Sequence, residues 1–365
     1  MGEQSSWKAM TNKPSGTSLL LLLIVLLVTL AAIFASIADF FPQGWFSLLI
    51  PLIITAITTS GLGFSVIPIL RKLKAGQVIQ EDGPEAHLKK AGTPTMGGIF
   101  FVPVAVVIAL VWSGFSTNVL AVSAVTLAYM TIGWIDDWQI LRQQSNKGLT
   151  PKMKLLLQIG IAVLFCLWML RTQPESLTNV LLPGRLVLPL GFAFWLLASF
   201  TLVAESNATN LTDGVDGLAG GTGAIAFLGL AGISVAIDPG LAIFCACLSG
   251  GCLGFVVHNR NPAKVFMGDT GSLALGGSLA SVGILSGNLW GLFILSGIFF
   301  VESLSVIAQV TYYKATKDAE GKGKRLLKMA PVHHHLELSG WHETQIVGAF
   351  YLINAGLALL AFVWR

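Results

Sequence analysis

Long apolar runs recur along this chain, and they constrain its fold more than any other feature does. A bilayer core about 30 Å thick needs roughly 20 apolar residues for each crossing helix. Only 11% of the residues are charged, against about 25% in a typical soluble domain. We therefore expect an all-α, polytopic integral membrane helical bundle of ten core transmembrane helices, preceded by an extra N-terminal apolar helix. The eleven predicted segments are Ser18–Ala38, Ser47–Leu70, Gly97–Trp112, Asn118–Ile135, Leu155–Leu170, Leu188–Ala204, Leu218–Ile237, Leu241–Val257, Ser272–Ser286, Leu289–Tyr312 and Gln345–Val363.

The first run, Ser18–Ala38, allows three interpretations. The basic residues before it, its apolar residues and the "ASIAD" stretch also fit a secretory signal peptide. The run is longer than a usual signal core, which favours an uncleaved membrane anchor. An interfacial helix outside the bundle is the third alternative. We accordingly separate residues 1–46, the tail with this extra segment, from residues 47–365, a single transmembrane domain.

Basic residues predict the orientation, because loops rich in Lys and Arg stay on the cytoplasmic side. If every segment crosses once, the basic loops after the second, fourth, eighth and tenth segments share one side. The last of these loops contains Lys314, Lys317, Lys322, Lys324, Arg325 and Lys328. The opposite side has only Arg171, Arg185 and Arg365. The pattern predicts a cytoplasmic N-terminus and a C-terminus on the outside.

Five aspartates stand at the predicted cytoplasmic ends of these segments, namely Asp136, Asp137, Asp213, Asp216 and Asp269. A helix cap or a solvated surface charge would explain any one of them. A charge near hydrocarbon costs at least a few kcal/mol unless it is paired or solvated. Five acids at one depth therefore indicate a shared polar site.

The spacing of these acids suggests different roles. Neighbours on a helix point about 100° apart, so Asp136 and Asp137 are poorly placed to chelate one ion together. One of them would face the site while the other holds a Lys or a backbone group. Asp269 lies in the glycine-flanked turn "FMGDTGS". A lone carboxylate in such a turn suits Mg²⁺, which takes one or two protein carboxylates plus phosphate oxygens and water.

The stretch "NATNLTDGVDGLAGG" is expected to open a helix, whose free N–H groups favour anions. Asp213 and Asp216 are three residues apart and would share one helical face. Asn210, one turn earlier, is a candidate contact for a base or a ribose.

Two basic loops, "HLKKAGTPTMGG" (87–98) and "NKGLTPKMK" (146–154), would face the acids. Their lysines follow from the positive-inside rule alone, but Lys also binds phosphates as a point charge. Glycines and threonines beside the lysines fit phosphate binding, although no Walker A motif is present. Asp, Lys and Gly at one membrane face together indicate a Mg²⁺-dependent phosphoryl-transfer site.

Half of the six histidines stand together in "KMAPVHHHLELSG" (328–340). The run is internal and short, so it is not a tag, and no Cys or fourth ligand accompanies it as a zinc site requires. We expect a cytoplasmic loop in which His333, His334 and His335 can donate hydrogen bonds to phosphate or sugar oxygens. Glu302 lies inside a predicted span, where we favour a structural role that joins two helices through a hydrogen bond.

Five motifs occur in this order: "GTPTMGG", "DD", "NATNLTDGVDGLAGG", "NPAKVFMGDTGS" and "APVHHHLEL". Together they resemble the phospho-N-acetylmuramoyl-pentapeptide transferase (MraY) family, within the polyprenyl-phosphate N-acetylhexosamine-1-phosphate transferase superfamily. The resemblance runs from about Ser47 to Arg365. The family has ten transmembrane helices with both termini outside, so Ser18–Ala38 is a departure from its pattern.

The resemblance implies transfer of phospho-MurNAc-pentapeptide from UDP-MurNAc-pentapeptide to undecaprenyl phosphate, giving lipid I and UMP with Mg²⁺. This is the first membrane step of peptidoglycan synthesis. It implies a multi-pass protein of the bacterial plasma (inner) membrane with its active site facing the cytoplasm. The expected partners are the two substrates and the lipid bilayer, without nucleic acid, and a homodimer is compatible with the resemblance.

By the same resemblance, Asp269 is the Mg²⁺ ligand, and Asp136 or Asp137 is the base that deprotonates the lipid phosphate. His333 and His334 complete the expected catalytic set. Direct attack of the lipid phosphate and a covalent phospho-enzyme both fit, and we favour direct attack because a phosphate oxyanion is already nucleophilic. The expected substrate-binding residues are Lys90, Thr95, Lys154, Asn210, Asp213, Asp216, Asn259, Phe266 and His335, with Phe266 stacking on uracil.

Two other functions compete with this one. An ion-coupled transporter would use its acids as a relay, but transporters usually place such acids near the bilayer midplane. Here only Glu302 lies that deep. A sister transferase would use UDP-GlcNAc, and the "APVHHHLEL" and "GTPTMGG" motifs favour the muramoyl-pentapeptide branch instead.

Overall fold

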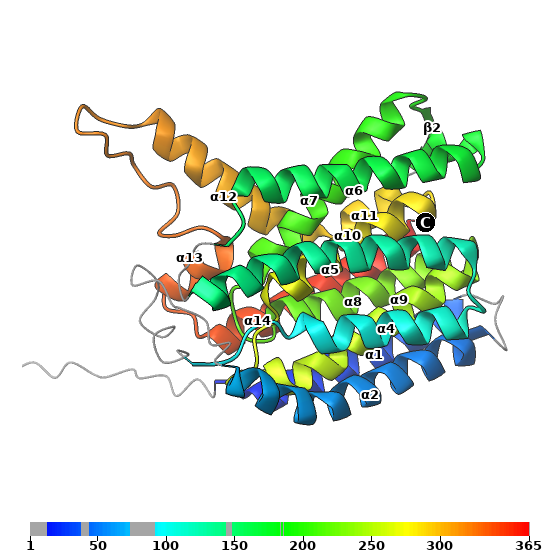
Figure 1. Cartoon of the computed structure of the whole chain (residues 1–365), viewed down its shortest axis with the longest axis horizontal. Coiled ribbons are helices and arrows are strands. Elements are labelled where there is room, and N and C mark those ends of the chain that lie inside the picture. Colours follow the sequence, from blue (N-terminus) through cyan, green and yellow to red (C-terminus); the bar gives the residue numbers. More distant parts are fainter. Residues whose placement is uncertain are drawn as a thin grey trace, which may run out of the picture.

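The computed structural model describes residues 13–37, 44–73, 92–143, 148–182, 184 and 186–364. Most of this part is helical, and most of the helices lie along one direction, with α7 and α12 oblique to the others (Figure 1). Their bounds are α1 (Gly16–Ile37), α2 (Gly44–Lys72), α4 (Gly98–Trp112), α5 (Thr117–Gln143), α6 (Pro151–Thr172), α7 (Ala193–Thr212), α8 (Leu218–Ser234), α9 (Pro239–Asn259), α10 (Gly268–Leu285), α11 (Leu289–Leu295), α12 (Gly297–Ala315), α13 (Val332–Leu338) and α14 (Glu343–Val363).

The predicted fold class is confirmed, since each expected apolar segment overlaps a helix. Within the described ranges, six helices are long and apolar enough to cross a membrane by themselves, and the bent pair α11–α12 makes a seventh. The helices α4 and α8 are shorter apolar helices packed among these. The chain is therefore a polytopic membrane helical protein.

Two of the expected segments differ in shape from the structure. The segment Leu188–Ala204 begins in a hairpin of two antiparallel strands, β1 (Asn179–Leu182) and β2 (Leu186–Pro189), and the helix starts only at Ala193. The strand pairing of residues 186–189 and the left-handed Gly191 (φ 51°) explain the delay, because these residues have extended or left-handed backbone that a helix does not allow. The segment Leu289–Tyr312 is not straight, because α11 and α12 meet at an angle of 72°.

The centre of the bundle consists of α8, α9 and α10, which are rich in glycine, alanine and serine. Small residues let helix backbones approach closely in a membrane bundle. A Cβ on Gly133 of α5 would lie 2.0 Å from the carbonyl oxygen of Asp269 at the start of α10. A Cβ on Gly98 of α4 would lie 2.3 Å from the backbone nitrogen of Gly271. These glycines hold three helix ends together, and the functional site forms there.

The first helix, α1, packs against α8 and α14 with one face and keeps the other face exposed. Its 22 residues correspond to about 33 Å of helix. A Cβ on Gly16 would clash with the backbone of Asn261, near the start of α14. At the other end, Phe34 stacks on Phe362 with ring centroids 4.4 Å apart. The helix thus runs parallel to α14 along its length, which favours a membrane-spanning anchor over an interfacial helix.

The helix α12 leaves the bundle after the bend (Figure 1). Ile298, Phe299 and Glu302, all in its first half, are its only buried residues. The following segment returns to α13, and α13 and the start of α14 lie at one end of the molecule. The strand β2 and the C-terminus lie at the other end (Figure 1).

We expect the two ends of α1 to face opposite sides of the membrane, and cysteine labelling tests this. Ser15 and Ser339 are exposed at one end of the bundle and Trp364 at the other, while the native cysteines are all buried. An impermeant maleimide should label Ser15→Cys and Ser339→Cys only from the cytoplasmic side, and Trp364→Cys only from the outside. If the reagent labelled both Ser15→Cys and Trp364→Cys from the same side of the membrane, a spanning α1 would be contradicted.

Candidate active site

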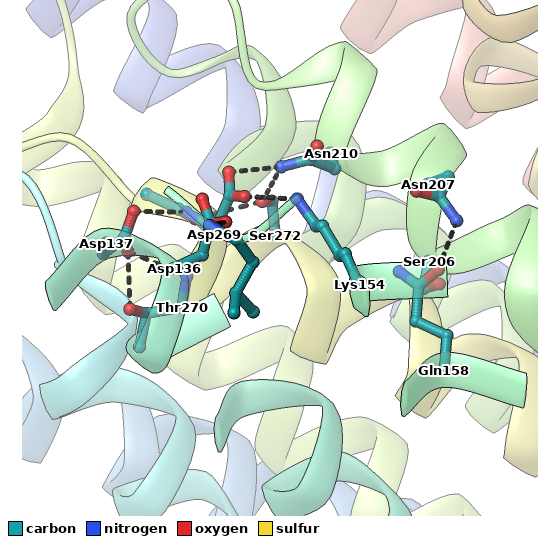
Figure 2. A network of polar contacts seen from close by, with 12 residues as sticks. Asp136, Asp137, Lys154, Gln158, Ser206, Asn207, Asn210, Asp269, Thr270 and Ser272 are labelled. Atoms are coloured by element: carbon teal, nitrogen blue, oxygen red, sulfur yellow. Dashed lines mark hydrogen bonds and ion pairs between the residues drawn. The ribbon is translucent and has the colours of Figure 1, made fainter. Parts of the chain in front are cut away.

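The C-terminal ends of α5 and α7 and the N-terminal ends of α6 and α10 bring most of the predicted acids together (Figure 2). Asp137 determines how α5 meets α10. Its carboxylate accepts the backbone N–H groups of Asp269 (3.2 Å) and Thr270 (3.0 Å) and the Thr270 hydroxyl (2.6 Å). A helix N-terminus has free N–H groups and a partial positive charge, so a buried carboxylate is stabilised there. Asp137 is therefore the group that holds backbone.

Asp136 has the other role. One of its oxygens accepts the backbone N–H of Leu149 at 2.7 Å. A Cβ on Gly148 would lie 2.6 Å from the Asp136 carboxylate, so this loop needs glycine to approach it. The Asp136 carboxyl lies within hydrogen-bonding reach of Asp269 (Figure 2). The Asp136 side chain thus faces the Asp269 carboxylate, whereas Asp137 contacts the backbone N–H of Asp269.

Asp269 stands at the first turn of α10, between two partners from different helices. Lys154 of α6 forms an ion pair with one carboxylate oxygen. The side-chain amide of Asn210, from α7, donates to the other oxygen (2.7 Å) and also to the Ser272 hydroxyl (2.9 Å). Lys154 and Asn210 were expected to touch substrate, and in this arrangement both orient the Asp269 carboxylate.

Asp213 caps the C-terminus of α7 and faces the same cluster. Burial raises the pKa of this carboxyl from 3.8 to about 8, and the neighbouring Asp269, Asp137 and Asp216 add to the rise. The backbone N–H of Gly268 opposes it by hydrogen bonding to the ionised form. The carboxyl is thus neutral near pH 7 unless a cation approaches.

The prediction that Asp213 and Asp216 share a helical face was wrong. The helix α8 begins only at Leu218, because Gly217 has a left-handed φ of 85° and ends the turn. Asp216 is 3% exposed and accepts hydrogen bonds from Asn261 (3.2 Å) and from the backbone N–H of Ala263 (3.0 Å). It therefore supports the loop that leads to Phe266.

Asn259 lies below the site surface. Its amide oxygen accepts the N–H of Gly217 at 2.9 Å, and its amide nitrogen donates to the carbonyl of Val265 at 2.9 Å. The side chain is 3% exposed, and in this arrangement it connects two loops of the site.

Residues 94–98 and 266–267 pair through their backbones. Phe266 N–H donates to Pro94 (2.8 Å), and Gly97 N–H donates to Phe266 (2.8 Å). This pairing places Thr95 beside Gly268, whose Cβ position lies 2.7 Å from the threonine hydroxyl. Thr95 and Phe266 are both partly exposed at this edge of the acid cluster. Lys90 lies outside the described residues.

The three histidines occupy the short helix α13, and each has a different partner. His333 is fully buried and contacts Glu302 through Nδ1 at 3.1 Å. His334 contacts the Glu337 carboxylate at 2.8 Å. Nδ1 of His335 accepts the backbone N–H of Lys328 at 3.1 Å. The expectation that Glu302 joins two helices through a hydrogen bond is confirmed, and the expected catalytic role of the buried His333 stays a prediction.

Several supporting residues were missed by sequence reasoning. Thr270 and Ser272 follow Asp269 in the "GDTGS" motif, and that motif was the available signal for them. Glu343 opens α14 and binds the backbone N–H of Asp216 and the Asn261 amide. Nothing in its surrounding sequence, "GWHETQ", indicates this contact.

The charge balance suggests what the site can hold. Asp136, Asp137, Asp213 and Asp269 interact electrostatically, and in the described part of the chain Lys154 is the cation paired with them. No cluster of three protein ligands is found among the described residues. Mg²⁺ does not need one, because it keeps several waters and usually combines one or two carboxylates with substrate phosphates. The donor set therefore fits a divalent cation that arrives with a phosphorylated ligand.

Comparison with known proteins gives two matching sequence profiles. Glycosyl transferase family 4 matches residues 119–287, and the phospho-N-acetylmuramoyl-pentapeptide-transferase signature 1 matches residues 90–102. Three similar proteins share the name phospho-N-acetylmuramoyl-pentapeptide-transferase. The one from Rippkaea orientalis is 74% identical over 96% of both chains, and that from Gloeothece citriformis is 70% identical over 97% of both. The one from Synechocystis sp. is 64% identical over 98% of this chain and 96% of its own.

We expect Asp137→Asn to destabilise the protein more than Asp136→Asn does. The side-chain amide introduced by Asp137→Asn would turn an N–H donor toward the donors at the start of α10, at a cost of about 1–3 kcal/mol. In Asp136→Asn, the new side chain can still accept the Leu149 N–H through its oxygen. Thermal unfolding of the two purified variants in detergent measures the difference. Equal melting temperatures would contradict the assignment of Asp137 to the helix start.

We also expect a pH effect from Asp213 in the protein without divalent cations. Between about pH 4 and pH 8 the unfolded chain has released this proton while the folded chain retains it. Stability should therefore fall as the pH rises through this range and level off above it. Asp213→Asn should flatten the fall, measured as melting temperature against pH. Asp318→Asn, in an exposed loop, is the control, and equal slopes in all three proteins would refute the effect.

Proposed function

The chain belongs to the phospho-N-acetylmuramoyl-pentapeptide-transferase family, and from that premise we propose that it makes lipid I. In this reaction it transfers phospho-MurNAc-pentapeptide from UDP-MurNAc-pentapeptide to undecaprenyl phosphate and releases UMP. The observation that carries the proposal is the 74% identity to a named transferase across 96% of the chain. The acid cluster at one end of an apolar helical bundle supports it, because one substrate is soluble and the other is a membrane lipid.

We place this reaction at the cytoplasmic face of the bacterial plasma membrane, in a catalytic domain formed by residues 47–365. Residues 1–46 contain the N-terminal tail, the whole of α1 and the first residues of α2. The basic residues at the site end of the helices support the orientation, since Arg71 and Lys72 end α2 and Arg142 ends α5. Lys314 near the end of α12 agrees with it.

Proteins of this family generally depend on a divalent metal, and we propose Mg²⁺ with Asp269 as its principal protein ligand. When bound, the ion neutralises charge on the diphosphate as UMP leaves. Asn210 and Lys154 orient the Asp269 carboxylate from two sides. The raised pKa of Asp213 supports the same proposal, because a site that disfavours a further negative charge gains most from a cation.

We propose Asp136 as the base. Its neighbour Asp137 has both oxygens engaged with the start of α10, whereas Asp136 faces Asp269. A proton from the lipid phosphate would pass to the Asp136 carboxylate. The freed phosphate oxygen then attacks the sugar-linked phosphorus of the donor. A new P–O bond forms to that phosphorus, its bond to the bridging oxygen breaks, and UMP departs with that oxygen.

The donor would lie along the exposed edge of the cluster. Phe266 can stack on uracil, and Thr95, Lys90, Asn210 and Asp213 are proposed contacts of the nucleoside diphosphate. His334 and His335, on α13, are proposed to face the sugar or its phosphates. Asp216 and Asn259 would act through the loops that they connect.

Purified protein with Mg²⁺ should release UMP only when both substrates are present. Without undecaprenyl phosphate, direct attack allows no release, whereas a covalent route would give a burst of one UMP per enzyme. Asp136→Asn should lower kcat by about 10²–10⁴-fold. Asp269→Asn should abolish the UMP release that depends on Mg²⁺. UDP-GlcNAc serves as the control donor. The proposal fails if UMP release is absent, or if it persists undiminished in Asp269→Asn.

A further inference from the structure

A buried acid lies outside the acid cluster, on the helix that leaves the bundle. Glu302 of α12 is fully buried, and so is its partner His333 of α13. The two residues are separated by a long exposed segment of chain. An acid at this depth is expensive unless a partner compensates it. The pair therefore fixes α13 against α12 at one defined point.

Both oxygens of Glu302 contact His333. The backbone N–H of His333 donates to Oε1 at 3.3 Å, and Nδ1 of the imidazole lies 3.1 Å from Oε2. A carboxylate only accepts hydrogen bonds, so Nδ1 must carry the proton. The imidazole is consequently held in one tautomer and in one orientation.

The other ring nitrogen points at the loop between α7 and α8. Nε2 of His333 is buried and has no hydrogen-bond partner in the described part of the chain. A Cβ on Gly214 would lie only 2.1 Å from Nε2. The φ angle of Gly214 is outside the left-handed region, so its backbone would accept alanine. The imidazole, not the backbone, requires glycine here.

Gly214 directly follows Asp213, which faces the acid cluster, and lies two residues before Asp216, which holds the Asn261–Ala263 loop. The imidazole therefore buttresses the turn that presents these two acids. Any rotation of His333 would change the space available to that turn.

We propose that Glu302 is a positioning residue for the nucleotide-sugar substrate, acting through His333 on the Asp213–Asp216 turn. The inference rests on the proposed function for the identity of that substrate. It gives the buried histidine a task that needs no contact with ligand. It also connects α12, which is exposed over most of its length, to the side of the site that binds the nucleotide.

Glu302→Gln tests this with a minimal change in shape. Glutamine has one acceptor oxygen, so it can satisfy the His333 backbone N–H only by turning its NH₂ group toward Nδ1. The imidazole must then move its proton to Nε2, against Gly214. We expect the KM for UDP-MurNAc-pentapeptide to rise about 10- to 100-fold, as for loss of a charge-assisted hydrogen bond. The KM for undecaprenyl phosphate should stay within about twofold.

A spectroscopic readout separates positioning from general damage. In protein with ¹⁵N-labelled histidine, Nδ1 of His333 should appear protonated in the wild type and unprotonated in Glu302→Gln. Glu205→Gln is the matched control, since Glu205 is also buried and bonds Ser296 at the start of α12 without touching a histidine. It should leave the His333 signals and the nucleotide-sugar KM unchanged. Equal effects of both variants, or no effect of Glu302→Gln, would overturn the proposal.

Gly214→Ala tests the contact between His333 and residue 214 and leaves Glu302 unchanged. It should weaken the binding of UDP with Mg²⁺, measured by calorimetry, by about tenfold or more. Gly160→Ala, where nothing lies within 4 Å of the added methyl, is the control. Unchanged UDP affinity in Gly214→Ala would overturn the buttress. UDP binding is measured without turnover, so it is independent of the lipid I assay. Failure of that assay in the wild type would refute the proposed function and would leave the contact between His333 and Gly214 to be tested by UDP binding.

Discussion

The concentration of negative charge at one end of the bundle is the constraint on which the rest of the site depends. Like charges in a partly buried cluster repel one another strongly, so each acid here needs a defined reason to stay. Asp137 is stabilised by the start of α10, and Asp269 by Lys154 and Asn210. Asp213 has weaker support: burial is the main cause of its raised pKa, and the neighbouring acids add to the rise. A cation bound with a diphosphate would offset the repulsion among these acids.

The fold serves this cluster by keeping its helix ends close together. Glycines at the crossings of α4, α5 and α10 allow backbone contacts that no larger residue permits. The helix α12, by contrast, makes few close contacts with other helices, since it is buried only near its start and then extends away from them. Through Glu302 and His333 it is nevertheless connected to the α7–α8 turn. One end of the bundle thus links this largely exposed helix with the proposed nucleotide site.

Sequence reasoning predicted the apolar helices and the gathering of the acids, because both follow from composition along the chain. It also predicted that one of Asp136 and Asp137 faces the site while the other binds a Lys or a backbone group. Which acid has which role depends on where α10 starts in space, and the sequence does not show this. The 72° bend after Leu295 and the hairpin before Ala193 had no hydropathy signal. The pairing of Glu302 with His333 joins residues 31 positions apart, which no local pattern reveals. The histidine motif therefore indicated a loop near the site but not the burial of its first member.

The acid cluster is proposed to bind a divalent cation together with the diphosphate. Mn²⁺, a paramagnetic substitute for Mg²⁺, allows a direct measurement by electron paramagnetic resonance on the purified protein. We predict tight Mn²⁺ binding in the presence of UDP, much weaker binding without it, and loss of both in Asp269→Asn. Mn²⁺ binding that is independent of UDP, or unchanged in Asp269→Asn, would contradict the account.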